Sequence, residues 1–241
     1  FDIRYLDRDN AQQYCWTTSW GLSARFIGAI IMTHGDDAGL ILPPRLAPIQ
    51  VVVVPIYKHE DEKAAVMEAA AGIAQEMVDL GVRVKVDMRD HLTPGYKFND
   101  WELRGVPIRI EVGPRDVQSG SLPVARRDRR GREGKRAVVR GGLAHEIPAL
   151  LREIHGALLQ RAVEFREAHT RDVTNYEEFR EAVAGGFARA AWAGDSNEEE
   201  RLKEETKATL RCIPFEQPSA PGRCFYTGRP AKQVAIFGRA Y

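Results

Sequence analysis

Four consecutive valines, Val51 to Val54, constrain the fold of this chain more than any other stretch. A continuous β-branched run of this kind is typical of a strand that is buried on both faces of a sheet. A helix should cover it, and the amphipathic segment from Asp61 to Leu80 predicts one. A second strand is predicted at Val82 to Met88. This β-α-β order implies parallel pairing and a right-handed crossover.

The segment that follows completes a small α/β domain. Apolar and polar residues alternate from Val106 to Val112, which predicts a third strand with one polar face. Pro107 lacks a backbone donor and indicates the start or the edge of that strand. The stretches from Leu122 to Arg127 and from Arg136 to Arg140 flank a basic, glycine-containing tip and predict a hairpin.

The first part of the chain has a different character. Turn-forming side chains within Phe1 to Tyr14 predict a hairpin. The stretch from Phe26 to Met32 is apolar enough that we expect it to be buried, whether it is helical or extended. Three prolines between Leu42 and Pro48 predict a stiff connection, because they remove the backbone donors that a sheet would use. We place a domain boundary there.

The last part of the chain predicts an α+β unit. An amphipathic pattern from His145 to about His169 indicates the longest helix of the chain. Thr174 precedes Glu177, and Asp195 precedes Glu198, by the three residues of a capping box, so two further helices are expected to begin there. Short strands are expected at Gly186 to Trp192, Thr209 to Phe215 and Gln233 to Phe237.

Composition limits the classes of protein that fit. A chain of 241 residues with 44% apolar content should form more than one folding unit. Its 35 Lys and Arg nearly cancel its 34 Asp and Glu, so affinity for nucleic acid has to come from local clusters of charge. No apolar run of about 18 residues is present, so we expect no membrane partner.

Cysteine usage and the start of the chain add two expectations. Cysteines at 15, 212 and 224 cannot close a disulfide framework, which favours a reducing cytoplasm. The chain opens at Phe1 without an initiating Met and on a strand-like segment, which predicts that it was cut from a longer protein.

The most specific string runs from Trp16 to His34. Gly21 would let the backbone approach a ligand closely, and Arg25 offers a planar cation that can stack on a base or bind phosphate. The alternative is a buried glycine-arginine turn whose charge is satisfied by a carboxylate.

This string resembles motif 3 of prolyl-tRNA synthetases of the archaeal and eukaryotic type, which are class II aminoacyl-tRNA synthetases. The next stretch, Gly39 to Ile56, is similar to the family's passage into its anticodon-binding domain. The resemblance extends over essentially the whole chain. Its other specific strings are Pro94 to Glu102, Gly105 to Pro107, Glu111 to Asp116 and Phe237 to Tyr241.

The resemblance implies a fold in three parts. These are the end of a class II catalytic antiparallel sheet at 1–46, a mixed-sheet α/β anticodon-binding domain at 47–150, and a small α+β C-terminal extension at 151–241. It also implies ATP-dependent ligation of L-proline to tRNA-Pro through prolyl-adenylate, with Mg²⁺, in a homodimer. The family's motifs 1 and 2 would precede Phe1, so the fragment alone is expected to be inactive.

Site residues follow from the same resemblance. Arg25 would be the catalytic arginine that counters the ATP phosphates. The proline and ATP pocket would further include Ser19, Trp20, Gly21, Ser23 and the terminal Tyr241. Unpaired anticodon bases are read by stacking and by hydrogen bonds to their edges. The matching groups here are Lys97, Trp101, Glu102, Glu111, Arg115 and Asp116.

Two alternatives stay open in the anticodon region. In the first alternative, Trp101 and Phe98 are core residues, and Arg115 and Asp116 form a structural ion pair. The second concerns a hairpin in which only two acids oppose eight cations, a local net of six positive charges. This basic hairpin would either contact RNA phosphates or be a mobile, solvated loop. Its cations are Arg126, Arg127, Arg129, Arg130, Arg132, Lys135, Arg136 and Arg140.

In the C-terminal extension the family often holds zinc through cysteines on two loops. The first loop here, Trp192 to Glu198, has no cysteine, and the second keeps only Cys224. Since structural zinc usually needs four ligands, we predict no zinc and no other bound metal. Cys212 lies in an expected strand and is predicted to be a core residue.

Two rival functions use other classes of chemistry. A non-catalytic module of the anticodon-domain type could bind RNA or protein, whereas DNA is not an expected partner. A small-molecule α/β enzyme is disfavoured, because no glycine-rich phosphate loop follows the strand at Val51 to Val54.

Overall fold

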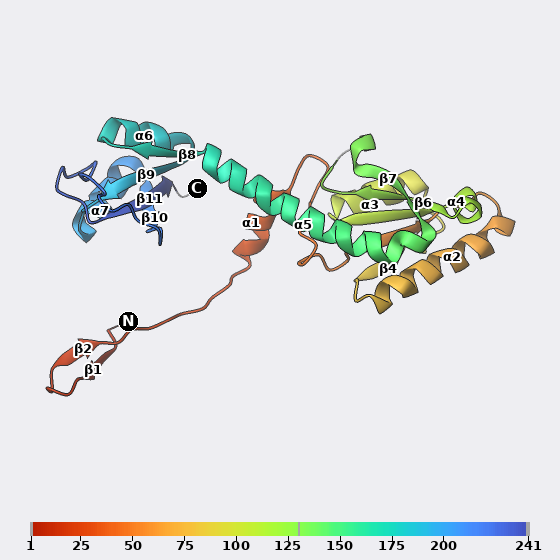
Figure 1. Ribbon diagram of the computed structural model, residues 1–241, viewed down its shortest axis with the longest axis horizontal. Helices are drawn as coiled ribbons and strands as arrows, with labels where there is room; N and C mark the ends of the chain where they lie inside the picture. Colours follow the sequence, from red (N-terminus) through yellow and green to blue (C-terminus); the bar gives the residue numbers. More distant parts are fainter. Residues whose placement is uncertain (1, 130, 240–241) are drawn as a thin grey trace. The chain divides into compact units, whose positions relative to one another are not determined.

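The computed structural model describes residues 2–129 and 131–239 (Figure 1). The chain divides into two compact units, Phe1–His155 and Gly156–Tyr241. The division of the sequence at 46/47 and 150/151 stays a prediction. Within the described ranges, no helix is long and apolar enough to cross a membrane.

The first unit contains a five-stranded mixed sheet in the order β4-β3-β5-β6-β7. The buried strand β3 (Val51–Pro55) pairs in parallel with β4 (Val84–Val86) and with β5 (Ile108–Val112). β6 (Ser121–Arg126) and β7 (Lys135–Val139) continue the sheet in antiparallel pairing. The mixed sheet and the hairpin are therefore confirmed, and Pro107 lies one residue before β5, as a strand start requires.

Helices cover both faces around β3. Val52 and Val54 pack with Trp101 of α3 (Pro94–Leu103). Val51 and Val53 point the other way and are also fully buried, so α2 (Glu60–Asp79), whose buried residues recur at helical spacing, covers the second face. The predicted crossover helix is thus confirmed, whereas α3 and the short α4 (Pro114–Ser119) were not predicted.

The longest helix predicted from the sequence is confirmed as α5 (Leu143–Ala168). Its first half belongs to the first unit, where Leu143, Ile147 and Ile154 are fully buried. Two short 3-10 turns, Gly131–Gly134 and Arg140–Gly142, flank β7.

At the start of the chain the predicted hairpin is confirmed as β1 (Arg4–Leu6) and β2 (Gln12–Tyr14). The expectation of burial from Phe26 to Met32 is wrong for this structure. These residues form α1 (Arg25–His34), in which Phe26 is 56% and Met32 65% exposed. Apolar residues become buried only where another surface covers them, and no residue of this helix is buried in the described structure.

The proline-rich connection after α1 is fixed to the first unit by backbone contacts. The amide of Leu40 donates to the carbonyl of Leu103 at 3.0 Å, and the amide of Leu42 donates to that of Gly105 at 3.2 Å. The guanidinium of Arg83 donates to the carbonyls of Pro44 at 3.0 Å and Ala47 at 2.9 Å. Gly105 has a φ of +71°, and a Cβ atom at this position would lie 2.6 Å from the Cβ of Leu40.

The second unit is built on a four-stranded sheet in the order β10-β11-β9-β8. Three strands were predicted and are confirmed as β9 (Phe187–Trp192), β10 (Ala208–Cys212) and β11 (Gln233–Arg239). The fourth, β8 (Thr170–Val173), was missed because three of its four residues are polar; it pairs in parallel with β9.

Both helices predicted in the second unit are present. α7 (Ser196–Thr206) begins at the predicted capping box of Asp195 and Glu198. α6 (Tyr176–Gly185) begins one residue later than predicted. Its cap is Asn175, which accepts from the amide of Glu178 at 3.0 Å, because that side chain reaches the free amides of the first turn better than Thr174 does.

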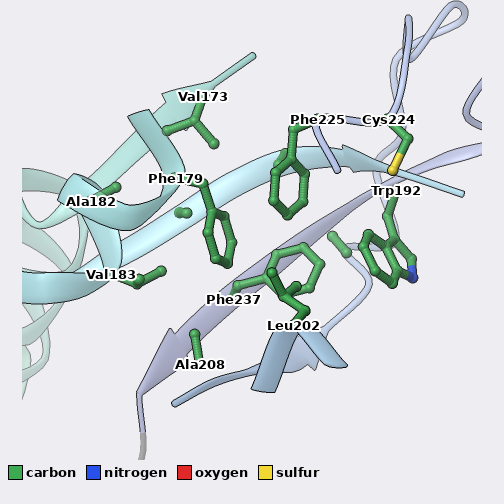
Figure 2. Packing of buried hydrophobic residues seen from close by; sticks show 13 residues of the cluster. Val173, Phe179, Ala182, Val183, Trp192, Leu202, Ala208, Cys224, Phe225 and Phe237 are labelled. Carbon is green, nitrogen blue, oxygen red and sulfur yellow. The ribbon is translucent and has the colours of Figure 1, made fainter. Parts of the chain in front are cut away.

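Stacked aromatic rings form the core of the second unit (Figure 2). Phe179 stacks on Phe225 with ring centroids 4.3 Å apart, and Phe237 meets the rings of Phe179 and Trp192 edge-on. Cys224 is buried in this cluster. The prediction for Cys212 is wrong: this residue is exposed at the end of β10, where the strand bulges.

We predict that Gly105→Ala destabilises the first unit more than Gly81→Ala does. Both glycines have positive φ, which costs an alanine about 1 kcal/mol. Only Gly105 would also force its Cβ into Leu40, adding about 1 to 3 kcal/mol of overpacking. Urea denaturation of both variants measures the difference, and equal losses would show that the connection at residues 36–48 is not tightly fixed.

Candidate nucleic-acid interface

Half of one sheet face in the first unit carries no helix. Arg109 lies opposite Ala125, which lies opposite Lys135, so these residues share a face with Glu111. α3 covers this face over β3, whereas over β6 and β7 the side chains are partly or fully exposed and, apart from that of Lys135, short. We call this region the open sheet face; it comprises Arg109, Glu111, Pro123, Ala125, Lys135 and Ala137.

A charged network crosses the open sheet face. Arg109 donates to Glu102 at 2.9 Å and, through two nitrogens, to one oxygen of Glu111 at 3.3 Å. Lys135 donates to the other oxygen of Glu111 at 2.6 Å. The guanidinium of Arg109 lies 4.1 Å from the ring centre of Phe98. Because the side chain of Arg109 is only 12% exposed and that of Glu111 only 7%, both groups are held in fixed orientations.

A polar hollow of about 330 Å³ adjoins this network, at the low end of the sizes typical of ligand pockets. Its walls come from α3, β5, β6, the hairpin tip and the turn after α1. They include Ala38, Glu102, Arg109, Arg127, Arg129 and Lys135. Fixed donors and acceptors beside a space of this size can bind a planar polar group such as a nucleobase.

Two of the predicted anticodon residues meet at Asp87 and not at the open sheet face. Trp101 donates to the Asp87 carboxylate at 2.8 Å, and Lys97 donates to its backbone carbonyl at 3.4 Å. Burial would raise the pKa of Asp87, but hydrogen bonds from Arg89 and Trp101 outweigh it and hold that pKa well below its usual range. Burial lowers the pKa of Lys97, although the charge of Asp87 opposes this shift. The proposed alternative of a core tryptophan matches the packing of Trp101.

The last two predicted anticodon residues lie at the start of α4. Asp116 accepts from the amide of Gly113 at 2.8 Å and so caps the helix. Arg115 is exposed, and no ion pair joins it to Asp116 among the described residues. The alternative of a structural Arg115–Asp116 pair therefore finds no support in the side-chain contacts.

The basic hairpin is far less charged than its sequence indicates. Acids distant in the sequence pair with its cations: Asp36 with Arg127, and Glu111 with Lys135. Arg126 pairs with Asp128 and Glu153, Arg136 with Glu146, and Arg140 with Glu76. The local net of six positive charges is thus an overestimate, because the fold brings in carboxylates that a local count omits. Arg130 lies outside the described residues.

The residues predicted to bind ATP and proline are not gathered into a pocket. A segment without regular secondary structure carries the first four, and Trp20 is 94% exposed. Arg25 is the first residue of α1 and is also exposed. The described residues therefore do not fit a nucleotide with Mg²⁺. The four in that segment are Ser19, Trp20, Gly21 and Ser23; Tyr241 lies outside the described residues.

No group of three His, Cys, Asp or Glu side chains that could hold a metal occurs in the part of the chain that the structure describes. The thiol of Cys224 instead accepts from the amide of Thr227 at 3.5 Å. Burial would raise the pKa of Cys224, but this and neighbouring hydrogen bonds lower it. The absence of zinc stays a prediction.

The sequence analysis missed Arg109 and Asp87, each of which joins two predicted residues. A signal for Arg109 was present, because Arg109 and Glu111 are charged residues within an otherwise apolar strand. Asp87 gave no such signal, since it continues the alternation of polar residues Arg83 and Lys85 along the predicted strand, where such side chains are expected to face solvent.

We predict that Asp87→Asn lowers the free energy of unfolding at pH 7 by about 2 kcal/mol or more, because it removes a buried charge that Arg89 needs. The folded-state pKa of Asp87 is depressed, so its contribution is complete above the ordinary value of about 3.9 and is lost as pH falls below it. The free energy of unfolding of the variant should therefore fall less than that of the wild type as the pH is lowered into the acid range. Asp90→Asn, at an exposed position, is the control, and equal losses in both variants would contradict the assigned network.

Comparisons with known proteins identify two segments of the chain and relatives along its whole length. The family model described as "Anticodon binding domain" matches residues 50–141, and "Prolyl-tRNA synthetase, C-terminal" matches residues 176–241. "Proline--tRNA ligase" of Roseiflexus castenholzii is 58% identical over 241 residues, all of this chain and 50% of the relative. The corresponding ligase of Chloroflexus aurantiacus is also 58% identical, again over 50% of its length.

A plant relative is similar over the same region. "Proline--tRNA ligase, chloroplastic/mitochondrial" of Arabidopsis thaliana is 47% identical over 245 residues, covering all of this chain and 45% of the relative. The chain thus spans about half the length of the curated relatives it matches. With both family models in chain order and this similarity along its whole length, the chain belongs to the prolyl-tRNA synthetase family.

Proposed function

We propose that this chain supplies the tRNA-recognition part of a prolyl-tRNA ligase and that the open sheet face binds the anticodon of tRNA-Pro. The observation that carries the proposal is the fixed carboxylate of Glu111 between Arg109 and Lys135, inside the segment that matches anticodon-binding domains.

The chemistry of the open sheet face suits guanine, which a proline anticodon contains twice. A carboxylate accepts from the amino edge of guanine, and Arg or Lys donates to its ring and carbonyl acceptors. The short side chains of Ala125 and Ala137 leave room for an unstacked base to approach these groups.

The other predicted anticodon residues receive distinct proposed roles. Lys97 and Trp101 are buried, so we propose that they fix α3 and thereby the position of Glu102. Arg115 is exposed and would contact RNA directly, whereas Asp116 would orient it by capping α4.

Catalysis is proposed for the whole ligase and not for this chain alone. The complete reaction would join L-proline to tRNA-Pro with ATP and Mg²⁺ in a homodimer, with Arg25 as the catalytic arginine. A pocket that encloses Arg25 is needed for that role, and the described residues do not form one. A cytoplasmic location likewise stays a proposal, since the Arabidopsis relative is named chloroplastic/mitochondrial.

The decisive measurement is binding of the chain to a tRNA-Pro anticodon stem-loop and to stem-loops in which each guanine is replaced, at fixed salt. We expect each replacement to weaken binding by about 1 to 3 kcal/mol, the scale of a lost base-edge contact. Glu111→Gln should abolish this discrimination, while Glu133→Gln on the hairpin should preserve it. Equal affinity for all stem-loops would refute the assignment of the open sheet face.

We also predict a shallow salt dependence. Each phosphate contact to single-stranded RNA adds about −0.7 to the slope of log affinity against log salt. All eight hairpin cations together would give a slope near −6, but most are already paired with carboxylates. Among the described cations, Arg132 is exposed without a carboxylate partner, and Arg129 is exposed and only shares Glu153 with Arg126, at 3.5 Å, so the expected slope is about −1 to −2. A salt titration of stem-loop binding distinguishes a slope of about −6, for eight free cations, from the expected slope of about −1 to −2.

A further inference from the structure

The position of α1 depends on the turn that follows it. No residue of α1 is buried as a whole, although the Nδ1 atom of His34, at the C-terminal end of the helix, is shielded from solvent, so the helix is held mainly at that end. Its C-terminal end continues into the turn Asp36–Gly39, whose two ends exchange backbone hydrogen bonds of 2.9 Å. Whatever fixes this turn therefore fixes the end of α1.

The Asp36 side chain joins this turn to β6. One of its oxygens accepts from the amide of Ala38 at 2.9 Å and from Arg127 at 2.6 Å. The other oxygen accepts from a second nitrogen of Arg127 at 3.1 Å. Such a bidentate pair fixes orientation as well as distance. The Arg127 side chain is only 4% exposed, so this contact has little access to competing water.

The same pair borders the hollow beside the open sheet face. Ala38 and Arg127 both line that hollow, together with Glu102 and Arg109. Arg127 also donates to the backbone carbonyl of Glu102 at 2.9 Å, while the side chain of Glu102 accepts from Arg109. A continuous series of polar contacts therefore leads from Glu111 to the end of α1.

We propose that Asp36 and Arg127 are positioning residues which couple occupancy of the hollow to the placement of α1, the helix that carries Arg25. A planar group in the hollow would contact Ala38 and Arg127 and restrict the turn. The inference rests on the proposed function, because it takes the anticodon loop as the ligand of the hollow.

Amide hydrogen exchange of the 241-residue chain, with and without the tRNA-Pro anticodon stem-loop, tests this coupling. Saturating stem-loop should slow exchange at residues 31–40 about fivefold or more, the lower range of typical coupling between sites. The amides of α7 in the second unit serve as an internal reference and should not change.

Two neighbouring aspartates provide matched variants. Asp36→Asn removes one partner of the bidentate pair, whereas Asp37→Asn changes an exposed carboxylate. Asp37→Asn should keep the slowing, and Asp36→Asn should reduce it to less than about twofold while the stem-loop still binds. Arg127→Lys keeps the charge but loses the bidentate geometry. It should also reduce the slowing to less than about twofold, and it replaces Asp36→Asn in the test if that variant does not fold.

The outcomes separate the two proposals. A stem-loop that binds the wild-type chain without slowing exchange at residues 31–40 would overturn the coupling and leave anticodon recognition intact. Equal slowing in wild type and Asp36→Asn would also overturn it. A stem-loop that does not bind at all would overturn both.

Discussion

The guanidinium of Arg109 is the group on which the open sheet face depends. It lies in β5, the middle strand of the five, where a charge is costly unless every donor has a partner. Glu102, Glu111 and the ring of Phe98 supply these partners from α3 and from β5 itself. The geometry of Glu111 therefore follows from satisfying Arg109, and the contacts that make the buried charge tolerable also hold the open sheet face in a fixed geometry.

The second unit depends on a different interaction, the packing of aromatic side chains on a small sheet. A small four-stranded sheet has little area to bury, and here aromatic rings from α6, β9 and β11 supply the largest side chains of the core. Phe225 and Cys224 bring a loop into this core, and hydrogen bonds to the thiol fix the turn of that loop. The loop is thus ordered by packing and backbone donors in the described structure.

Sequence patterns predicted the elements that depend on local chemistry. The valine run gave β3, helical spacing gave α2 and α5, and a capping box gave the start of α7. Patterns failed where the outcome depends on distant partners. β8 is polar and exists as a strand only because β9 lies beside it. α1 is apolar, yet none of its residues is buried in the described structure. The charges of the hairpin, likewise, could not be assessed without Asp36, Glu76 and Glu146.

Ion pairing within the hairpin would set the kinetics of RNA encounter on the proposed function. Long-range attraction that raises association rates needs an uncompensated field, and here most cations already face carboxylates. A cognate and a non-cognate anticodon should then arrive at similar rates. Discrimination must lie in how long each one stays, because the fixed contacts around Glu111 act only after arrival. On the proposed function, the paired hairpin would therefore give the open sheet face its selectivity through residence time.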